Sequence, residues 1–242
     1  MRPRSAPALW VATSMASSSA FSWAETGAGR QLCCGRLRGF SRFWSEQRGG
    51  LSKNGAVSID YATGKLLVAT PRTGGNDFRR SVVLVLQHDE DGAQGVVLNH
   101  PLQAPVSSVL PTWQDYVTHP PNVFQGGPVA MDSALGLVTV PGDQKEPMGV
   151  RLLFGGIGLV DLDIPPQVVM PEVAGLRIFA GYAGWSDGQL EQEIREGGWY
   201  VVESEARDAF TPVPESLWVS VLRRQRGNLA FVASLPEDPT LN

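Results

Sequence analysis

The stretch 81–87, SVVLVLQ, decides the fold class, because it is rich in β-branched residues and almost entirely apolar. Such a run is typical of a strand that is covered on both faces of its sheet. A polar turn, HDEDG at 88–92, separates it from a second run of the same kind, GVVLN at 95–99. The two runs therefore predict a buried, hairpin-like pair of strands.

Similar short runs follow this pair along the chain, and Gly, Pro and Asp residues separate them. They predict strands over 65–70, 122–125, 134–140, 157–163, 176–182 and 199–203. Helices are fewer: apolar stripes predict them over 189–196 and 214–224, with a short helical turn at 106–110. Because strands dominate and helices do not alternate regularly with them, the sequence predicts an α+β fold with a mixed sheet.

The first residues differ in composition from the rest of the chain. Residues 1–53 carry 8 Lys/Arg against 2 Asp/Glu, are rich in Ser, Arg, Gly and Ala, and lack a sustained hydrophobic period. Three interpretations stay open: sequence upstream of the native start, a flexible tail, or a targeting peptide. In each case we expect 1–56 to be a disordered extension and 57–242 to form the domain. We expect a cytoplasmic protein, or an imported organellar one if 1–53 is a genuine transit peptide.

Charge and composition argue against several classes of function. Residues 54–242 carry 12 Lys/Arg against 22 Asp/Glu, whereas duplex recognition depends on cations that neutralise phosphates. No apolar run is long enough for a transmembrane helix, so we expect no membrane partner. Cys33 and Cys34 are adjacent and have no metal-ligand spacing around them, so we expect no disulfide framework and no metal. The sequence also lacks a complete dinucleotide fingerprint and a phosphate-loop lysine motif, so we expect no cofactor.

The motif GWSDG at 184–188 has the G-x-S-x-G form of a nucleophile elbow, which also lies between a strand and a helix. A hydrolase of that fold needs a histidine downstream of the serine, but His88, His100 and His119 all lie upstream. Ser186 and Gln189 instead have the spacing of a capping box. We therefore expect Ser186 to cap the helix that follows.

Two further motifs each allow a structural and a functional interpretation. The acidic turn at 88–91 (HDED) is more consistent with a solvated hairpin than with a metal site, because consecutive side chains diverge. Gly126-Gly127-Pro128 would either expose backbone amides to an anion or let two segments cross closely.

Several segments resemble the AlgH (YqgE) family in order and spacing, over about 63–242. The segments are GKLLVATP (64–71), DFRRSVV (77–83), HDEDGA (88–93), GVVLNHP (95–101), QGGPV (125–129), GYAGWSDGQLE (181–191), Trp218 and LRRQ (222–225). The closing PEDPTLN is similar to actinobacterial members. The resemblance implies one compact α+β domain with a branched, mixed sheet flanked by a few helices.

The resemblance also implies a site and carries a traditional label of transcriptional regulator. Loops on a rigid sheet commonly hold sites, and the recurrent residues of the motifs fall at loops or strand ends. The candidate ligand-binding residues are Asp77, Arg80, His88, Asn99, Gly126, Gly127, Tyr182, Trp185, Gln189 and Glu191. The alternative is that these residues only fix turns and caps.

The sequence departs from the family pattern in three places. His100 replaces the usual Arg, which puts an anion role there in doubt. Ser186 occupies a variable position, and Pro171 interrupts a stretch that looks helical in relatives.

Our leading hypothesis is a non-enzymatic binding or regulatory protein that contacts an unknown protein or small ligand at the GGPV/GYAGW region. The alternative is an enzyme at the same surface with Glu191 or His88 as acid or base. Direct contact with DNA is the weakest hypothesis because of the charge.

Overall fold

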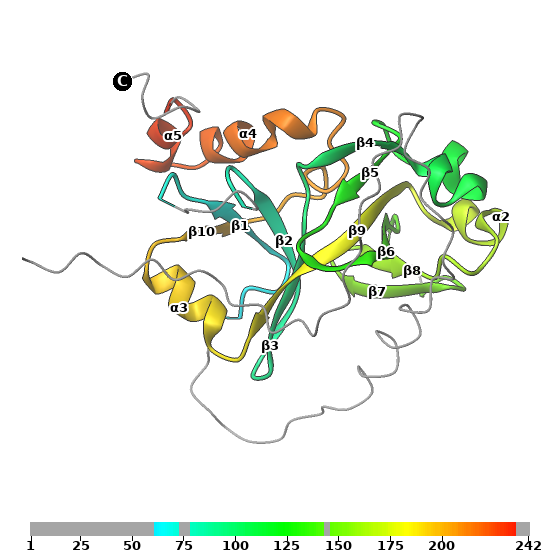
Figure 1. The fold of residues 1–242 in the computed structure, drawn as a ribbon, viewed down its shortest axis with the longest axis horizontal. Helices are drawn as coiled ribbons and strands as arrows, with labels where there is room; N and C mark the ends of the chain where they lie inside the picture. Colours follow the sequence, from blue (N-terminus) through cyan, green and yellow to red (C-terminus); the bar gives the residue numbers. More distant parts are fainter. Residues whose placement is uncertain (1–60, 73–77, 143–145, 236–242) are drawn as a thin grey trace, which may run out of the picture. The chain divides into compact units, whose positions relative to one another are not determined.

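A computed structural model describes residues 61–72, 78–142 and 146–235. The expected extension over 1–56, Cys33, Cys34 and Asp77 lie outside these residues. The described part of the chain forms a ten-stranded sheet in the order β10-β1-β2-β3-β9-β6-β8-β7, and β4 and β5 leave this path as a branch (Figure 1).

One half of the sheet is built from the buried pair that the sequence predicted. β2 (Val82–Asp89) pairs with β3 (Gly92–Val97) and with β1 (Lys65–Ala69), and β10 (Trp199–Glu203) closes the edge beside β1; every pairing is antiparallel. The expectation of a turn over 88–92 was wrong at its start, because His88 lies within β2 opposite Ala93. Only two residues therefore separate the two strands.

The long strand β9 (Gly175–Ser186) joins the two halves of the sheet. One side of β9 pairs with β3 and, in parallel and further toward the start of β9, with β5 (Asn122–Gln125). The other side pairs with β6 (Val129–Thr139). β8 (Ile157–Val160), β7 (Val150–Phe154) and β4 (Pro101–Pro105) complete the second half. The predicted mixed, branched sheet of an α+β fold is thus confirmed.

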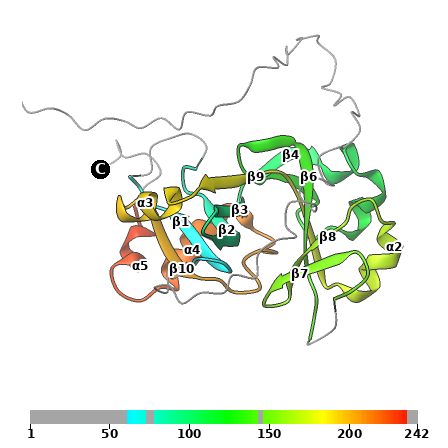
Figure 2. The same ribbon diagram turned by 90° about the horizontal axis from the view of Figure 1, so that it is seen from below.

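Short helices cover the sheet. The helices predicted near 189–196, 214–224 and 106–110 are α3 (Gln189–Arg195), η4 (Pro214–Ser216) continued by α4 (Leu217–Arg223), and η1 (Val106–Ser108). The sequence did not predict η2 (Pro111–Tyr116), α2 (Pro166–Val169), η3 (Met170–Glu172) or α5 (Leu229–Val232). Figure 2 shows α2 at the end of the domain opposite α3 and α5. No helix among the described residues is both long and apolar enough to span a membrane.

The strands β1 and β2 divide the core into two layers, because successive side chains point to opposite faces. Leu66 and Leu84 lie in the cluster that contains Trp218 of α4. Leu67 and Val83 lie in the cluster that contains Leu190 of α3. α4 and α3 thus cover opposite faces of the same strands (Figure 1). A third cluster surrounds Trp113, Val138, Leu176 and their neighbours in the second half of the sheet.

Candidate functional site

The contacts sort the predicted site residues into three groups. One group connects α3 to the sheet, one holds the turn before β2, and one lies where two backbone segments cross. Asp77 lies outside the described residues. The three groups, in that order, are His88, Trp185, Gln189 and Glu191; Arg80 and Asn99; and Gly126, Gly127 and Tyr182.

His88 has both ring nitrogens occupied. Nδ1 accepts the backbone N–H of Ala62 at 3.0 Å, and Nε2 lies 2.9 Å from Oε1 of Glu191. Because Nδ1 accepts, this geometry assigns the ring proton to Nε2, which donates to the carboxylate. The ring of Tyr61 packs edge-on against the imidazole, and only 3% of the His88 side chain is exposed. His88 and Glu191 therefore fasten α3 to the sheet.

Glu193, which the sequence reasoning did not select, is the centre of the group under α3. Its Oε2 accepts the indole N–H of Trp185 at 2.9 Å and that of Trp199 at 2.8 Å, and its Oε1 accepts from Gln189. Trp185 is buried and packs edge-on against Trp199. An acid on an amphipathic helix is usually part of a solvated face, so this role could not be predicted from the local pattern. Trp185 and Gln189 hold α3 in place through Glu193.

Ser186 does not cap α3, and the expectation that it would was wrong. The N-cap is Gly188, in the left-handed region at φ 69°, and no side chain bonds to the helix amides there. Instead, Oε1 of Gln189 accepts from both the backbone N–H and the hydroxyl of Ser186, at 3.1 Å each. The glutamine thus makes only the returning half of a capping box.

Asn99 fixes the backbone of the turn that precedes β2. Its Oδ1 accepts the N–H of Val82 at 2.8 Å, and its Nδ2 donates to the carbonyl of Arg80 at 2.9 Å. Arg80 has a φ of 52°, which a residue with a Cβ rarely adopts. Its guanidinium lies 4.5 Å from the ring centroid of Trp218 and donates to the carbonyl of Leu235. Asn99 therefore orders a strained turn, and Arg80 connects that turn to α4 and to the residues that follow α5.

His100 lies beside Ser81 at the same turn. Its Nε2 is 3.4 Å from the hydroxyl oxygen of Ser81. Burial lowers the pKa of His100, and a hydrogen bond to the backbone of Arg79 partly offsets this effect. Ser81 is fully buried, so its hydroxyl has no direct access to a substrate. This serine–histidine contact is therefore structural.

Gly126 and Gly127 let the chain cross the middle of β9. The N–H of Gly126 donates to the carbonyl of Ala180 at 2.9 Å, and its own carbonyl accepts from Val97 at 2.8 Å. A Cβ at Gly126 would lie 2.2 Å from the carbonyl oxygen of Gly181, and one at Gly127 would lie 2.2 Å from the carbonyl carbon of Tyr182. The glycines are thus required for close approach of backbone to backbone.

A small apolar surface lies over this crossing. Val129 pairs with Tyr182, but the next pair is Ala134 with Ala180, so residues 130–133 bulge out of β6. The bulge presents Met131 with 45% of its surface exposed, beside Val129 at 37% and the half-buried Tyr182. Val129 and Tyr182 both border the space above Gly184. We call Val129, Met131 and Tyr182 the crossing surface.

Known proteins resemble the part of the chain that contains these groups. The AlgH-like family matches residues 66–230, which span all three groups. The chain belongs to the AlgH-like family. A UPF0301 protein of Streptomyces coelicolor is 55% identical over 192 residues, covering 78% of this chain and 100% of the relative. A UPF0301 protein of Thermobifida fusca is 48% identical, covering 74% of this chain and 95% of its own.

Solved structures agree with the fold of this AlgH-like chain. A crystal structure of a Corynebacterium diphtheriae protein is 32% identical and superposes with a TM-score of 0.67, covering 76% of this chain and 95% of that one. The solution structure of the AlgH protein from Pseudomonas aeruginosa, 24% identical, has a TM-score of 0.56 over 76% of this chain and 98% of that one. The resemblance that the sequence predicted, including its actinobacterial character, is confirmed.

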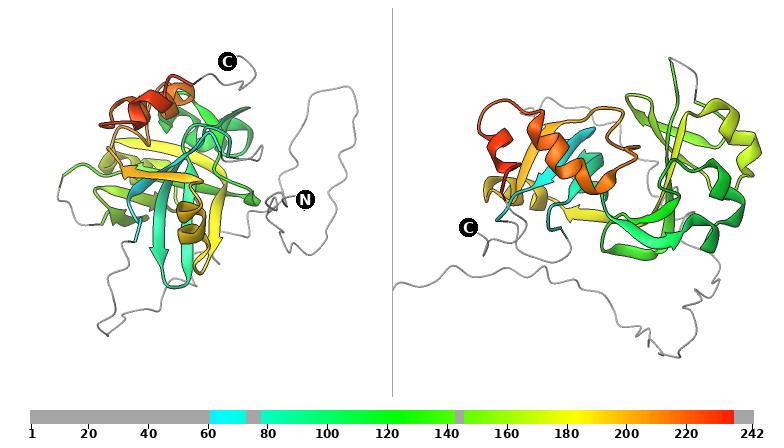
Figure 3. Two further views of the ribbon diagram at one scale, coloured as in Figure 1. Left: turned by 90° about the vertical axis from the view of Figure 1, so that its left-hand side faces the viewer. Right: turned by 90° about the horizontal axis from the view of Figure 1, so that it is seen from above.

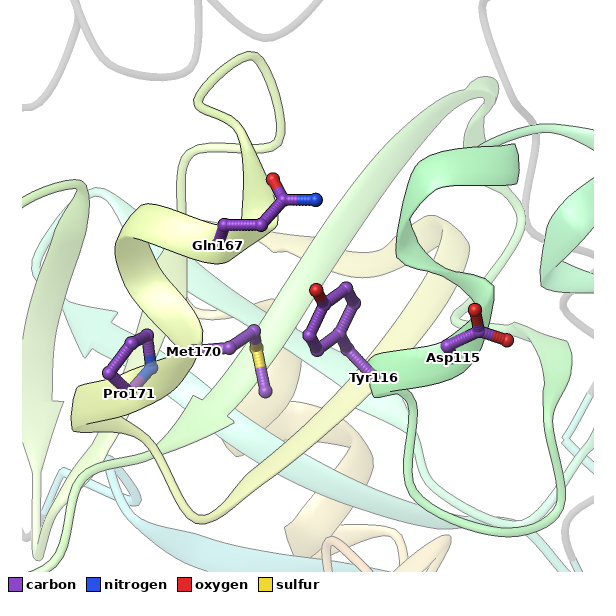
Figure 4. A pocket seen from close by; sticks show the side chains of 5 residues that line it. All are labelled: Asp115, Tyr116, Gln167, Met170 and Pro171. Carbon is purple, nitrogen blue, oxygen red and sulfur yellow. The ribbon is translucent and has the colours of Figure 1, made fainter.

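Two hollows of the AlgH-like domain lie away from the predicted residues. One, of about 530 Å³, is open to solvent between η2 and the α2–η3 segment (Figure 4), where Tyr116 and Met170 face one another. Its other lining residues are Asp115, Gln167 and Pro171. Pro171 does not stop the helical stretch at once, because η3 continues α2 through it. A second hollow, of about 130 Å³, lies beside Phe154, Glu205 and Asp208.

Arg177 of β9 is a buried cation whose partners are neutral. Its guanidinium donates to the carbonyls of Ala209 at 2.9 Å, Thr211 at 2.8 Å and His119 at 3.2 Å, and it lies 4.3 Å from the ring centroid of Phe124. Burial lowers its pKa to about 10. These bonds hold the segment before α4 against the sheet, which is a structural task.

The described residues of the AlgH-like chain do not form a metal-binding site. They contain no group of three or more His, Cys, Asp or Glu side chains positioned to share an ion. In the acidic turn, the backbone N–H of Asp91 donates to Oδ1 of Asp89 at 3.0 Å.

Proposed function

We propose that this chain is a non-catalytic binding protein, and that the crossing surface of Val129, Met131 and Tyr182 contacts a partner protein. The observation that carries the proposal is the exposure of Val129 and Met131, beside the half-buried Tyr182, over a closely packed glycine crossing. Exposed aromatic and Met side chains are enriched where proteins meet. A rigid backbone beneath them limits the entropy that is lost on binding.

The shape of the surface favours a protein over a small ligand. Small-molecule sites are concave and enclose most of their ligand. Met131 instead stands on a bulge, and the two hollows described above are lined by other residues. The thioether of a methionine is flexible enough to adapt to a partner's side chains. The crossing surface therefore suits a protein contact.

The occupied polar groups support a non-catalytic role. An acid, base or nucleophile must reach the substrate. His88 uses both ring nitrogens within the domain, and Ser81 is fully buried. Ser186 is exposed, but its hydroxyl donates to Oε1 of Gln189 at 3.1 Å. The enzyme hypothesis gains no support from these contacts.

A regulatory role fits this proposal if it acts through protein contacts. The acidic balance of residues 54–242 disfavours a duplex, so we propose that any effect on transcription is indirect. A cytoplasmic location is part of the same proposal.

The test compares two exposed methionines. Met131 lies on the crossing surface, whereas Met148 is 71% exposed outside it. The full chain would be used to capture proteins from the host organism, and the dissociation constant of the purified complex would then be measured. We expect Met131→Asp to weaken binding at least about tenfold, because it places a charge in an apolar contact, and Met148→Asp to leave it unchanged. Equal effects of both substitutions, or no protein that discriminates them, would overturn the proposal.

A further inference from the structure

The strand β10 forms one edge of the sheet, and its outer side can be identified from one bond. The backbone N–H of Thr70 donates to the carbonyl of Gly198 at 3.0 Å. Backbone groups alternate in direction along a strand, so Gly198, Tyr200 and Val202 point theirs toward β1. Trp199, Val201 and Glu203 consequently direct their N–H and C=O groups away from the sheet.

Most of these outward groups have no partner within the described part of the chain. The carbonyl of Glu203 accepts from the guanidinium of Arg224 at 3.0 Å. β10 pairs with β1 alone, and no described residue bonds to the outward groups of Trp199 or Val201. Figure 3 (left) shows this strand facing outward between α5 and α3.

The sequence of this edge, WYVVE, lacks the usual protection against pairing. Natural edge strands carry Lys, Pro or a bulge that blocks a second strand. β10 has none of these, its register with β1 is regular, and Val201 is 37% exposed. An unprotected edge of this kind binds another strand unless something covers it.

We propose that β10 is the interface of a homodimer, in which two copies pair antiparallel about a two-fold axis at Val201. In this register Val201 lies opposite Val201 and Trp199 lies opposite Glu203. The outward N–H and C=O of Val201 then form two reciprocal hydrogen bonds at the axis. An interface of this symmetry uses the same patch on both subunits.

Self-complementarity identifies the occupant as a second copy. The strand has five residues, and its central residue points its backbone groups outward, as the two-fold axis requires. No like charges face each other, because the only charged residue, Glu203, lies opposite Trp199. Within each copy, Nζ of Lys65 lies 3.9 Å from Oε1 of Glu203 and partly balances the negative charge of Glu203.

The surfaces beside the strand enlarge the contact. A two-fold axis perpendicular to the sheet places α5 of one copy beside α5 of the other. Phe231 of α5 is 76% exposed, and Leu235, which follows α5, is 40% exposed. The helix α5 lies at the same end of the domain as β10 (Figure 1). A stable interface buries on the order of 1,000 Å² or more, which a strand pair alone does not supply. The α5 contact would provide further apolar area.

The experiment uses charges at the axis of the full-length chain. Sedimentation equilibrium and light scattering should show a dimer for the wild type at concentrations up to about 1 mM. Val201→Lys and Val201→Glu should each weaken the dimer at least roughly tenfold, because each places like charges face to face. A mixture of the two variants should form a heterodimer, since Lys then lies opposite Glu.

The matched control is Val213→Lys, which changes a valine that is 53% exposed outside β10 and should leave the dimer intact. Circular dichroism would show that all variants are folded. A monomeric wild type over the whole concentration range, or a dimeric Val201→Lys, would overturn the proposal. Failure of the Lys–Glu mixture to restore the dimer would refute the two-fold register.

Discussion

The helices α3 and α4 have seven residues each and cover opposite faces of the same strands, yet they are held in different ways. α4 buries Leu217, Trp218, Val221 and Leu222. α3 fully buries only Leu190 and is fastened by carboxylates that bind two indoles and an imidazole. One helix depends on apolar area, and the other depends on directed hydrogen bonds.

The two faces should therefore respond to different substitutions. Apolar burial scales with the area removed from water and is non-directional. A buried hydrogen bond contributes little net stability, but removing its acceptor leaves a donor without a partner. Truncation of a large side chain should therefore damage the α4 face most, and loss of a single carboxylate should damage the α3 face most.

The largest expected effect is at Trp218, which packs in the core and donates its indole N–H to Ala69 at 2.9 Å. Trp218→Ala should lower the free energy of unfolding by about 4 kcal/mol, because it leaves a large cavity. Urea denaturation measures this loss. Trp218→Phe keeps most of the ring area and should cost about 2 kcal/mol. Equal losses for the two variants would show that the hydrogen bond, and not area, holds α4.

The next effect is at Glu193. Glu193→Ala removes the acceptor of Trp185 and Trp199 and should lower the free energy of unfolding by about 3 kcal/mol. Urea denaturation gives the loss, and the indole N–H resonances report whether both bonds are broken. Glu196→Ala is the control, since the carboxylate of this exposed acid at the end of α3 accepts a hydrogen bond from Gln192 and from no other described residue. A similar loss in the control would contradict the assigned role.

Glu191→Gln should have a smaller effect, about 0.5 kcal/mol, because the amide oxygen can still accept from Nε2 of His88. Urea denaturation again provides the measurement. A loss above about 2 kcal/mol would mean that α3 depends on the carboxylate charge, and not merely on an acceptor.

The smallest expected effect is a pH dependence of stability that comes from His100. Burial lowers the pKa of His100 in the folded chain, so the unfolded chain takes up a proton first as the pH falls. This group's contribution to stability is therefore present above about pH 6.5 and is lost below it. Wild type should lose more stability than His100→Gln between about pH 7.5 and about pH 5.5, as measured by urea midpoints. An identical pH dependence would assign the acid sensitivity elsewhere.

The sequence predicted the parts of the fold that have a strong local pattern. The apolar runs of β2 and the stripe of α4 were visible because burial demands them. β4 was not predicted, because PLQAP contains two prolines and is partly exposed. β9 extends four residues beyond the predicted end at 182, because Ala183–Ser186 continue the strand by pairing with β3, a contact between distant segments that leaves no local apolar run.

The candidate site was harder to predict, because its groups depend on contacts between distant segments. The motifs selected Gly126 and Gly127, but only the structure shows β9 passing against them. Glu193 was missed because a helical acid is usually solvated, and Arg177 was missed because its partners are backbone carbonyls. The binding role assigned to these motif residues stays a prediction.

The position of β9 also constrains how the chain folds as it leaves the ribosome. β3 and β6 are synthesised long before Gly175–Ser186, the strand that pairs with both of them. β1 likewise waits for β10. Until β9 emerges, a nascent chain therefore exposes unpaired strand edges, which favour aggregation. Chains truncated before β9 should consequently remain insoluble or bound to chaperones, and neither half of the sheet should fold as an independent fragment.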